Sequence, residues 1–108
     1  MKIFDKNAAL SLLDNDESLL EILVDSFKNE NKFERSELEN LIKEKKFKEA
    51  AEYVHATKGA ARQLCMENLM ASGQELEDVL RGKKSGDIES LCGKMFSDYE
   101  EAMKEISR

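Results

Sequence analysis

The stretch FKEAAEYVHATKGAARQL, residues 47 to 64, contains the only histidine of the 108-residue chain. Its apolar residues recur every three or four positions, as the buried stripe of an amphipathic helix does. These residues are Phe47, Ala50, Val54, Ala61 and Leu64. The spacing predicts one long helix of about 18 residues with a single buried face and His55 near its middle.

The same periodicity predicts five further helices on either side of this stretch. The first covers residues 5 to 13 with Asp5 as a candidate N-cap, and the acidic cluster 14–17 follows it. The fifth ends in the segment 81–87, where Gly82 and Gly86 are natural stops. The second, third, fifth and sixth helices carry their apolar stripes within 19–27, 38–42, 66–80 and 88–106, and the junction near 29–32 is weakly marked.

Composition supports a helical fold throughout the chain. Hydrophobic residues make up 41% and charged residues 37%, and proline and tryptophan are absent, a balance that favours helices. A chain of this length supports one hydrophobic core. We therefore predict a single all-α domain over residues 1–108, an up-and-down antiparallel four-helix bundle with additional short N-terminal helices.

Charge and cysteine content exclude several classes of function. The net charge of −6 argues against binding to nucleic acid or to an anionic membrane. No apolar run spans a bilayer and the N-terminus lacks a signal-peptide pattern, so we expect a soluble, cytoplasmic monomer. Cys65 and Cys92 lie in apolar patterns and are predicted to be reduced core residues. One histidine builds neither a zinc site nor a di-iron site, so no metal or cofactor is expected.

The surroundings of His55 suggest chemistry at its imidazole ring. The ring is predicted to lie at the edge of the buried face, with Lys58, Gly59 and Arg62 on the same side of the helix. A glycine inside a helix costs about 1 kcal/mol relative to alanine. The benefit that we expect from this glycine is space for a large partner to approach the ring.

An imidazole that is mostly uncharged at neutral pH can accept a phosphoryl group directly. Lys58 and Arg62 would stabilise the negative charge of that group. The chain has no glycine-rich phosphate loop, so the phosphate would come from another protein. The alternative is an ordinary surface histidine beside a solvated charged face.

The pattern at residues 55–59 resembles the H-x-L-K-G motif of histidine-containing phosphotransfer (HPt) domains, and the likeness covers nearly the whole chain. His55, Lys58 and Gly59 match it, and the small residues Ala60 and Ala61 follow. Further likeness lies in Asn68 to Met70 and in the pair Leu76 and Glu77. Thr57 departs from the leucine of the motif, and Cys65 stands where many members have glycine.

The resemblance implies a role for each matching residue. His55 would be phosphorylated, Lys58 would neutralise the phosphoryl group and Gly59 would admit a receiver domain. Glu77 would accept a hydrogen bond from Nδ1–H of the ring and leave Nε2 as the attacking atom; alternatively, it is a surface carboxylate paired with Arg81 at i+4. Receiver domains would dock on apolar residues of the N-terminal helices, which could equally be plain core: Ala8, Leu12, Leu13 and Leu20.

We therefore expect a phosphocarrier without kinase activity, which accepts a phosphoryl group from a response-regulator receiver domain or from a sensor histidine kinase and passes it to another receiver domain. The proline-containing motif of a dimerising kinase helix is absent, since Ala56 follows His55 and the chain has no proline. The initial methionine favours a free-standing protein. The rival hypothesis is a helical scaffold or regulatory binding module that uses no phosphorylation.

Overall fold

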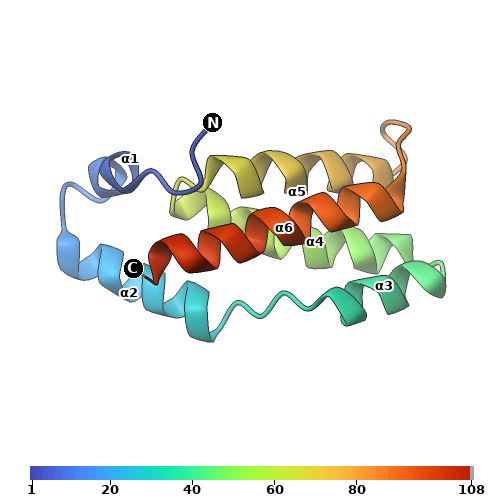
Figure 1. Cartoon of the computed structure of the whole chain (residues 1–108), viewed down its shortest axis with the longest axis horizontal. Helices are drawn as coiled ribbons and strands as arrows, with labels where there is room; N and C mark the ends of the chain where they lie inside the picture. Colours follow the sequence, from blue (N-terminus) through green and yellow to red (C-terminus); the bar gives the residue numbers. More distant parts are fainter. Residues whose placement is uncertain (108) are drawn as a thin grey trace.

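Residues 1–107, which a computed structural model describes, fold into six α-helices and no strands. The helices are α1 (Lys6–Leu12), α2 (Glu17–Asn29), α3 (Arg35–Lys43), α4 (Phe47–Gln63), α5 (Glu67–Leu80) and α6 (Ile88–Ile106). Figure 1 shows α4, α5 and α6 side by side along the length of the molecule. The predicted all-α bundle is confirmed.

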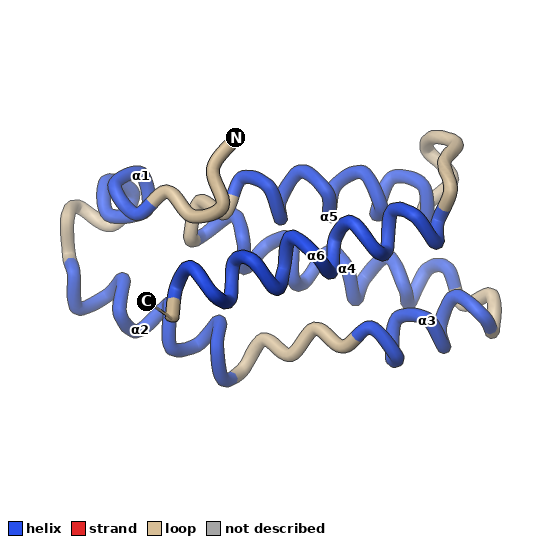
Figure 2. Tube along the Cα trace, in the orientation of Figure 1, coloured by secondary structure: helices blue, strands red, loops and turns tan. Residues whose placement is uncertain are grey.

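The fourth position of the bundle is shared by two short helices. Figure 2 shows α2 and α3 end to end along one edge, joined by an extended loop, and each long segment reverses the direction of the one before it. The small helix α1 packs at one end of the bundle, and the segment that precedes it lies over the turn between α4 and α5 (Figure 1). Up-and-down topology is therefore achieved with a broken fourth helix.

Aromatic side chains hold the loop between α2 and α3 against the bundle. Phe33 stacks on Phe96 of α6 with ring centroids 4.2 Å apart, and Tyr53 of α4 and Tyr99 of α6 flank it at 5.4 and 5.5 Å. The Tyr53 hydroxyl accepts from the backbone N–H of Glu34 and donates to a backbone carbonyl of the same loop. The weakly marked junction is thus a well-anchored segment, and Phe33 belongs to the core although it lies in no helical stripe.

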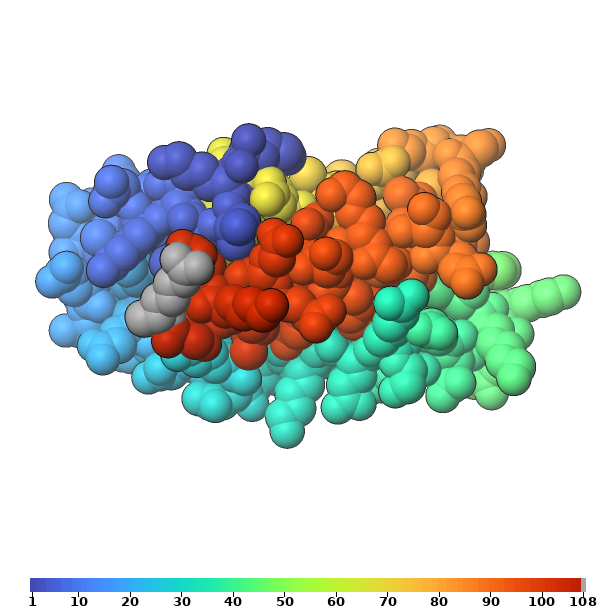
Figure 3. Space-filling view, viewed as in Figure 1, coloured from blue at the N-terminus to red at the C-terminus, as the bar shows by residue number. Residues whose placement is uncertain are grey.

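The core is built from the stripes that the sequence predicts. Leu38, Val54, Leu64, Leu76 and Met95 are all less than 2% exposed. The space-filling view in Figure 3 shows α6 and the N-terminal segment covering one face of the molecule. Close packing of α4 and α5 is helped by small residues in both helices, namely Ala50, Ala51, Ala61, Ser72 and Gly73, all of them buried.

Four helices end in the same hydrogen-bond pattern, and only one of them ends at a glycine. After α5 this residue is the predicted stop Gly82, with φ of 75°. After α1, α3 and α4 it is Asp14, Lys45 and Cys65, with φ of 52°, 59° and 54°. In each case two backbone N–H groups cap the last carbonyls of the helix, as in a Schellman motif. Cys65 therefore lies in a turn rather than in a helix, and its side chain packs against the core beside that turn.

Lys45 carries a backbone conformation that glycine adopts without steric cost. Its side chain is exposed, so Lys45→Gly should raise the free energy of unfolding by about 1 kcal/mol. The measurement is urea denaturation followed by circular dichroism. Lys48→Gly, at an exposed position inside α4, should lower the same quantity by about 0.5–1 kcal/mol. Equal effects of the two variants would contradict the assignment of the turn.

Candidate functional site

His55 projects from the middle of α4 with 58% of its side chain exposed. Its Nδ1 atom lies 3.2 Å from Oε1 and 3.1 Å from Oε2 of Glu77 on α5. A hydrogen bond from Nδ1–H to this carboxylate leaves Nε2 with its lone pair and without a proton. The ring is therefore accessible at one nitrogen and held by the protein at the other.

Glu77 is buried, with 7% of its side chain exposed, and three side chains contact its two oxygen atoms. Lys58 Nζ lies 2.8 Å from Oε1, and Arg81 Nε donates to Oε2 at 2.9 Å. Burial alone would raise the pKa of Glu77, but the hydrogen bonds from Lys58, Arg81 and His55 outweigh it and lower the pKa from 4.5 to about 2. The carboxylate is ionised throughout the physiological pH range.

Lys58 points into the bundle rather than along the outer surface of α4. Only 6% of its side chain is exposed, and Nζ also donates to Gln74 Oε1 at 2.8 Å. Gly73 makes this placement possible, since a Cβ atom there would lie 3.3 Å from Cβ of Lys58 and 3.1 Å from Cε of Met95. Helical spacing puts Lys58 on the side of His55, but the close approach of α5 turns its ammonium group toward Glu77.

Gly59 has no role in internal packing. A Cβ atom built at this position meets no atom within 4 Å. The residue lies one turn after His55 on α4 and leaves the surface beside the ring open. The helix thus keeps a destabilising residue for which its own packing gives no reason.

The remaining predicted residues lie outside this network. Arg62 is exposed and makes no ion pair within residues 1–107. On α1, Leu12 is 69% exposed, while Ala8 and Leu13 are half-buried. Leu20, in contrast, is 4% exposed and belongs to the core, so it is not available as a docking residue.

The structure adds three residues to the site that the site prediction did not include. The sequence suggests Arg81 only as the i+4 partner of a surface Glu77. The ion pair between Arg81 and Glu77 exists, but the Glu77 carboxylate is buried. Gln74 receives Lys58 and donates through Nε2 to Asp78 at 2.9 Å. The signal was present in the sequence, because Gln74, Glu77, Asp78 and Arg81 recur on one side of a helix at spacings of three and four.

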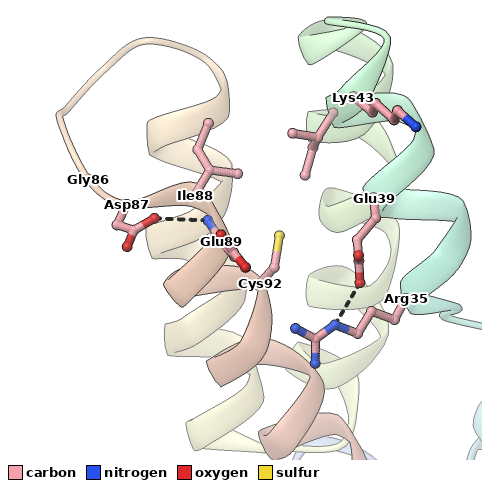
Figure 4. Close-up of a pocket in the computed structure, with 9 residues that line it drawn as sticks. Arg35, Glu39, Lys43, Gly86, Asp87, Ile88, Glu89 and Cys92 are labelled. Carbon is pink, nitrogen blue, oxygen red and sulfur yellow. Dashed lines mark hydrogen bonds and ion pairs between the residues drawn. The ribbon is translucent and has the colours of Figure 1, made fainter.

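A separate groove of about 490 Å³ lies between α3 and the start of α6 and contains none of these residues (Figure 4). Three of its charged side chains have local partners, since Arg35 Nε donates to Glu39 and Asp87 accepts from the backbone N–H of Glu89 (Figure 4). Within residues 1–107 no cluster of three or more histidine, cysteine, aspartate and glutamate side chains could hold a metal ion. The histidine face is therefore the candidate site.

Together these features define a helical bundle with one accessible imidazole backed by a buried, ionised carboxylate. A family model described as the Hpt domain matches residues 22–107. The chain therefore belongs to the Hpt domain family, which acts in two-component phosphorelays and signal transduction. The match begins within α2, so α1 lies outside it.

Searches among curated proteins and among solved structures give no match. In the part of the chain that the structure describes, no helix is long and apolar enough to cross a bilayer. Cys65 and Cys92 are both free thiols, and burial is the main cause that raises the pKa of each, for Cys92 to about 11.

The lowered pKa of Glu77 links the site to folding stability. Because the pKa is lower in the folded state than the ordinary value of 4.5, the stabilisation is complete above that value and is lost as the pH falls toward 2. Glu77→Gln should therefore cost about 2–3 kcal/mol of unfolding free energy at pH 7 and progressively less below pH ~4.5. Urea denaturation of both proteins between pH 7 and 2 measures this. A constant difference across that range would contradict the ion-pair network.

Proposed function

We propose that this protein is a histidine phosphocarrier in which Nε2 of His55 receives and returns the phosphoryl group. The observation that carries the proposal is the combination of an exposed ring with Nδ1 held by the ionised carboxylate of Glu77. Its donor is the aspartyl phosphate of a receiver domain or a sensor histidine kinase, and its acceptor is the aspartate of another receiver. We place this exchange in the cytoplasm.

The transfer needs no proton to leave or enter the ring. The Nε2 lone pair forms the N–P bond while the P–O bond to the receiver aspartate breaks, and the aspartate leaves as a carboxylate. The Nδ1 proton stays on the ring, which becomes cationic, and Glu77 offsets that charge at 3.1 Å. The reverse sequence returns the phosphoryl group to an aspartate, so one geometry serves both directions.

The neighbouring residues divide the remaining tasks. Lys58 acts mainly by holding Glu77, and one of its three N–H groups remains for a phosphoryl oxygen. Arg62 is the exposed cation on the outer side of α4 that can reach the phosphoryl group of a visiting partner. The partner supplies its own catalytic carboxylates and metal ion, and this chain contributes no kinase site.

Docking would use the surface beside the ring. The open space at Gly59 admits the receiver, and Ala8, Leu12 and Leu13 supply apolar contacts from α1. An exposed leucine on an N-terminal helix fits a transient protein interface. The N-terminal residues 1–21 precede the family match, so this surface is a place where partner choice can differ from that of relatives.

Phosphorylation of His55 is tested directly with a radiolabelled phosphorylated receiver from the same cell. The wild-type protein should acquire label that is acid-labile and stable to alkali, and His55→Gln should acquire none. Circular dichroism checks that the variant is folded, which we expect because the ring is exposed. Absence of label with every receiver tested, or label that persists in His55→Gln, would favour a helical scaffold or binding module.

The proposal predicts that a small side chain at residue 59 raises stability and that a large one slows transfer. Gly59→Ala should raise the unfolding free energy by about 0.5–1 kcal/mol, because alanine favours the helix and its Cβ meets no neighbour. Gly59→Leu should slow transfer from a receiver several-fold by blocking its approach, while reaction of the ring with small reagents remains unchanged. Gly73→Ala is the matched control, because its Cβ would lie 3.3 Å from Cβ of Lys58 inside the bundle, so it should gain less stability than Gly59→Ala. Unchanged transfer by Gly59→Leu would contradict the access role.

A further inference from the structure

Arg81 is the one cation of the site that the phosphocarrier proposal leaves without a task. It follows the last residue of α5, and its Nε donates to Oε2 of Glu77 at 2.9 Å. The same oxygen lies 3.1 Å from Nδ1 of His55. The guanidinium group and the imidazole ring therefore share one oxygen atom, and 31% of the arginine side chain is exposed.

The charges around Glu77 do not balance. Its single negative charge faces two positive charges, one on Lys58 from α4 and one on Arg81 from the end of α5. A neutral carboxylate–lysine pair would suffice to satisfy the buried oxygens and the buried ammonium group. The arginine thus adds a surplus positive charge directly behind the ring.

One other acidic side chain belongs to the network but makes no hydrogen bond or ion pair with Glu77. On α5, Asp78 accepts from the neutral amide of Gln74 and keeps its own negative charge on the side of the network where Gln74 receives Lys58. On the outer side of α4, Glu52 and Arg62 lie three and seven residues from His55, and both are exposed and of opposite sign. No contact of His55 or Glu77 with a charged residue of α3 or α6 occurs within residues 1–107.

We propose that Arg81 is a positioning residue which, acting through Glu77, opposes protonation of the His55 ring and so keeps Nε2 nucleophilic. A lone carboxylate against Nδ1 would favour the imidazolium form, which has no lone pair to attack phosphorus. The positive charge of Arg81 reduces this stabilisation of the imidazolium form and leaves intact the hydrogen bond that orients the ring. This inference rests on the proposed function of His55 and adds a control of its reactivity.

The same surplus favours the phosphorylated state. A phosphoryl group on Nε2 brings nearly two negative charges to the ring. The cation on the far side of Glu77 attracts that charge, although solvent at the exposed ring screens the attraction. One arginine therefore favours both the neutral acceptor and its product over the protonated ring, which cannot react.

The test measures ring reactivity without any partner protein. Diethyl pyrocarbonate reacts with the neutral imidazole, and because the chain has a single histidine, the ultraviolet absorbance of carbethoxylated imidazole reports on that ring alone. We expect Arg81→Gln to react about threefold more slowly than wild type near pH 6, because loss of a nearby positive charge favours the protonated ring. The two rates should converge as the pH rises, since the proposed effect acts on protonation alone.

Two further variants make the result specific. Lys83→Gln removes the same charge from an exposed residue near Arg81 that has no side-chain contact with Glu77, and its profile should match that of wild type. Arg81→Lys keeps the charge and should restore most of the reactivity near pH 6. Identical pH profiles of wild type and Arg81→Gln, or an equal shift in Lys83→Gln, would overturn the proposal.

Phosphotransfer separates this inference from the proposed function. If the ring is phosphorylated by a receiver, Arg81→Gln should show its largest loss of transfer rate on the acidic side of the pH profile. A protein that fails to accept phosphate but still shows the shifted carbethoxylation profile would overturn the phosphocarrier role and leave the control by Arg81 standing. Circular dichroism of Arg81→Gln verifies the fold, which an exposed residue beyond the end of α5 should not disturb.

Discussion

The site depends on one buried carboxylate. Glu77 lies under the surface between α4 and α5, where an ionised group is costly unless cations and hydrogen-bond donors satisfy its oxygens. Lys58 and Arg81 meet that requirement from two different directions and fix the plane of the carboxylate. The orientation of the exposed ring follows, because both oxygens lie at nearly equal distances from Nδ1. Buried charges thus determine the orientation of an exposed side chain.

Close packing of α4 and α5 is what brings these groups together. The lysine stem fits beneath α5 only because residue 73 has no side chain, and small residues line the same interface. A larger residue at 73 would separate the helices and lengthen the contact between Lys58 and Glu77. Residue 73 therefore affects both the packing of the helices and the geometry of the site, whereas a side chain at residue 59, on the outer side of α4, would meet no neighbouring atom.

The sequence predicts the helices and the exposed histidine, because apolar periodicity and a local motif identify them. Apolar spacing identifies the core stripes, and the exposed position of His55 follows from its angle to the stripe. The burial of Lys58 could not be predicted in this way, because helical spacing gives the side of the helix on which a residue lies but not whether a neighbouring helix approaches there. Three of these helix ends carry no glycine, and Asp14, Lys45 and Cys65 adopt there a backbone conformation that sequence patterns associate with glycine. Phe33 was missed because it is packed by three other aromatic rings outside any regular element.

Residues on the inner side of α4 are constrained by core packing, whereas residues on its outer side are not. Thr57, Lys58 and Ala61 face the bundle and are almost fully buried, so substitutions there disturb the core and the ring together. Ala56, Gly59 and Arg62 lie on the outer side, where no partner within the described chain restricts them. Differences in partner choice can therefore accumulate on the outer side of α4 and on α1 without altering the network that orients the imidazole. Under the proposed function, the reactivity of His55 and the identity of its partner protein are therefore separable properties of this fold.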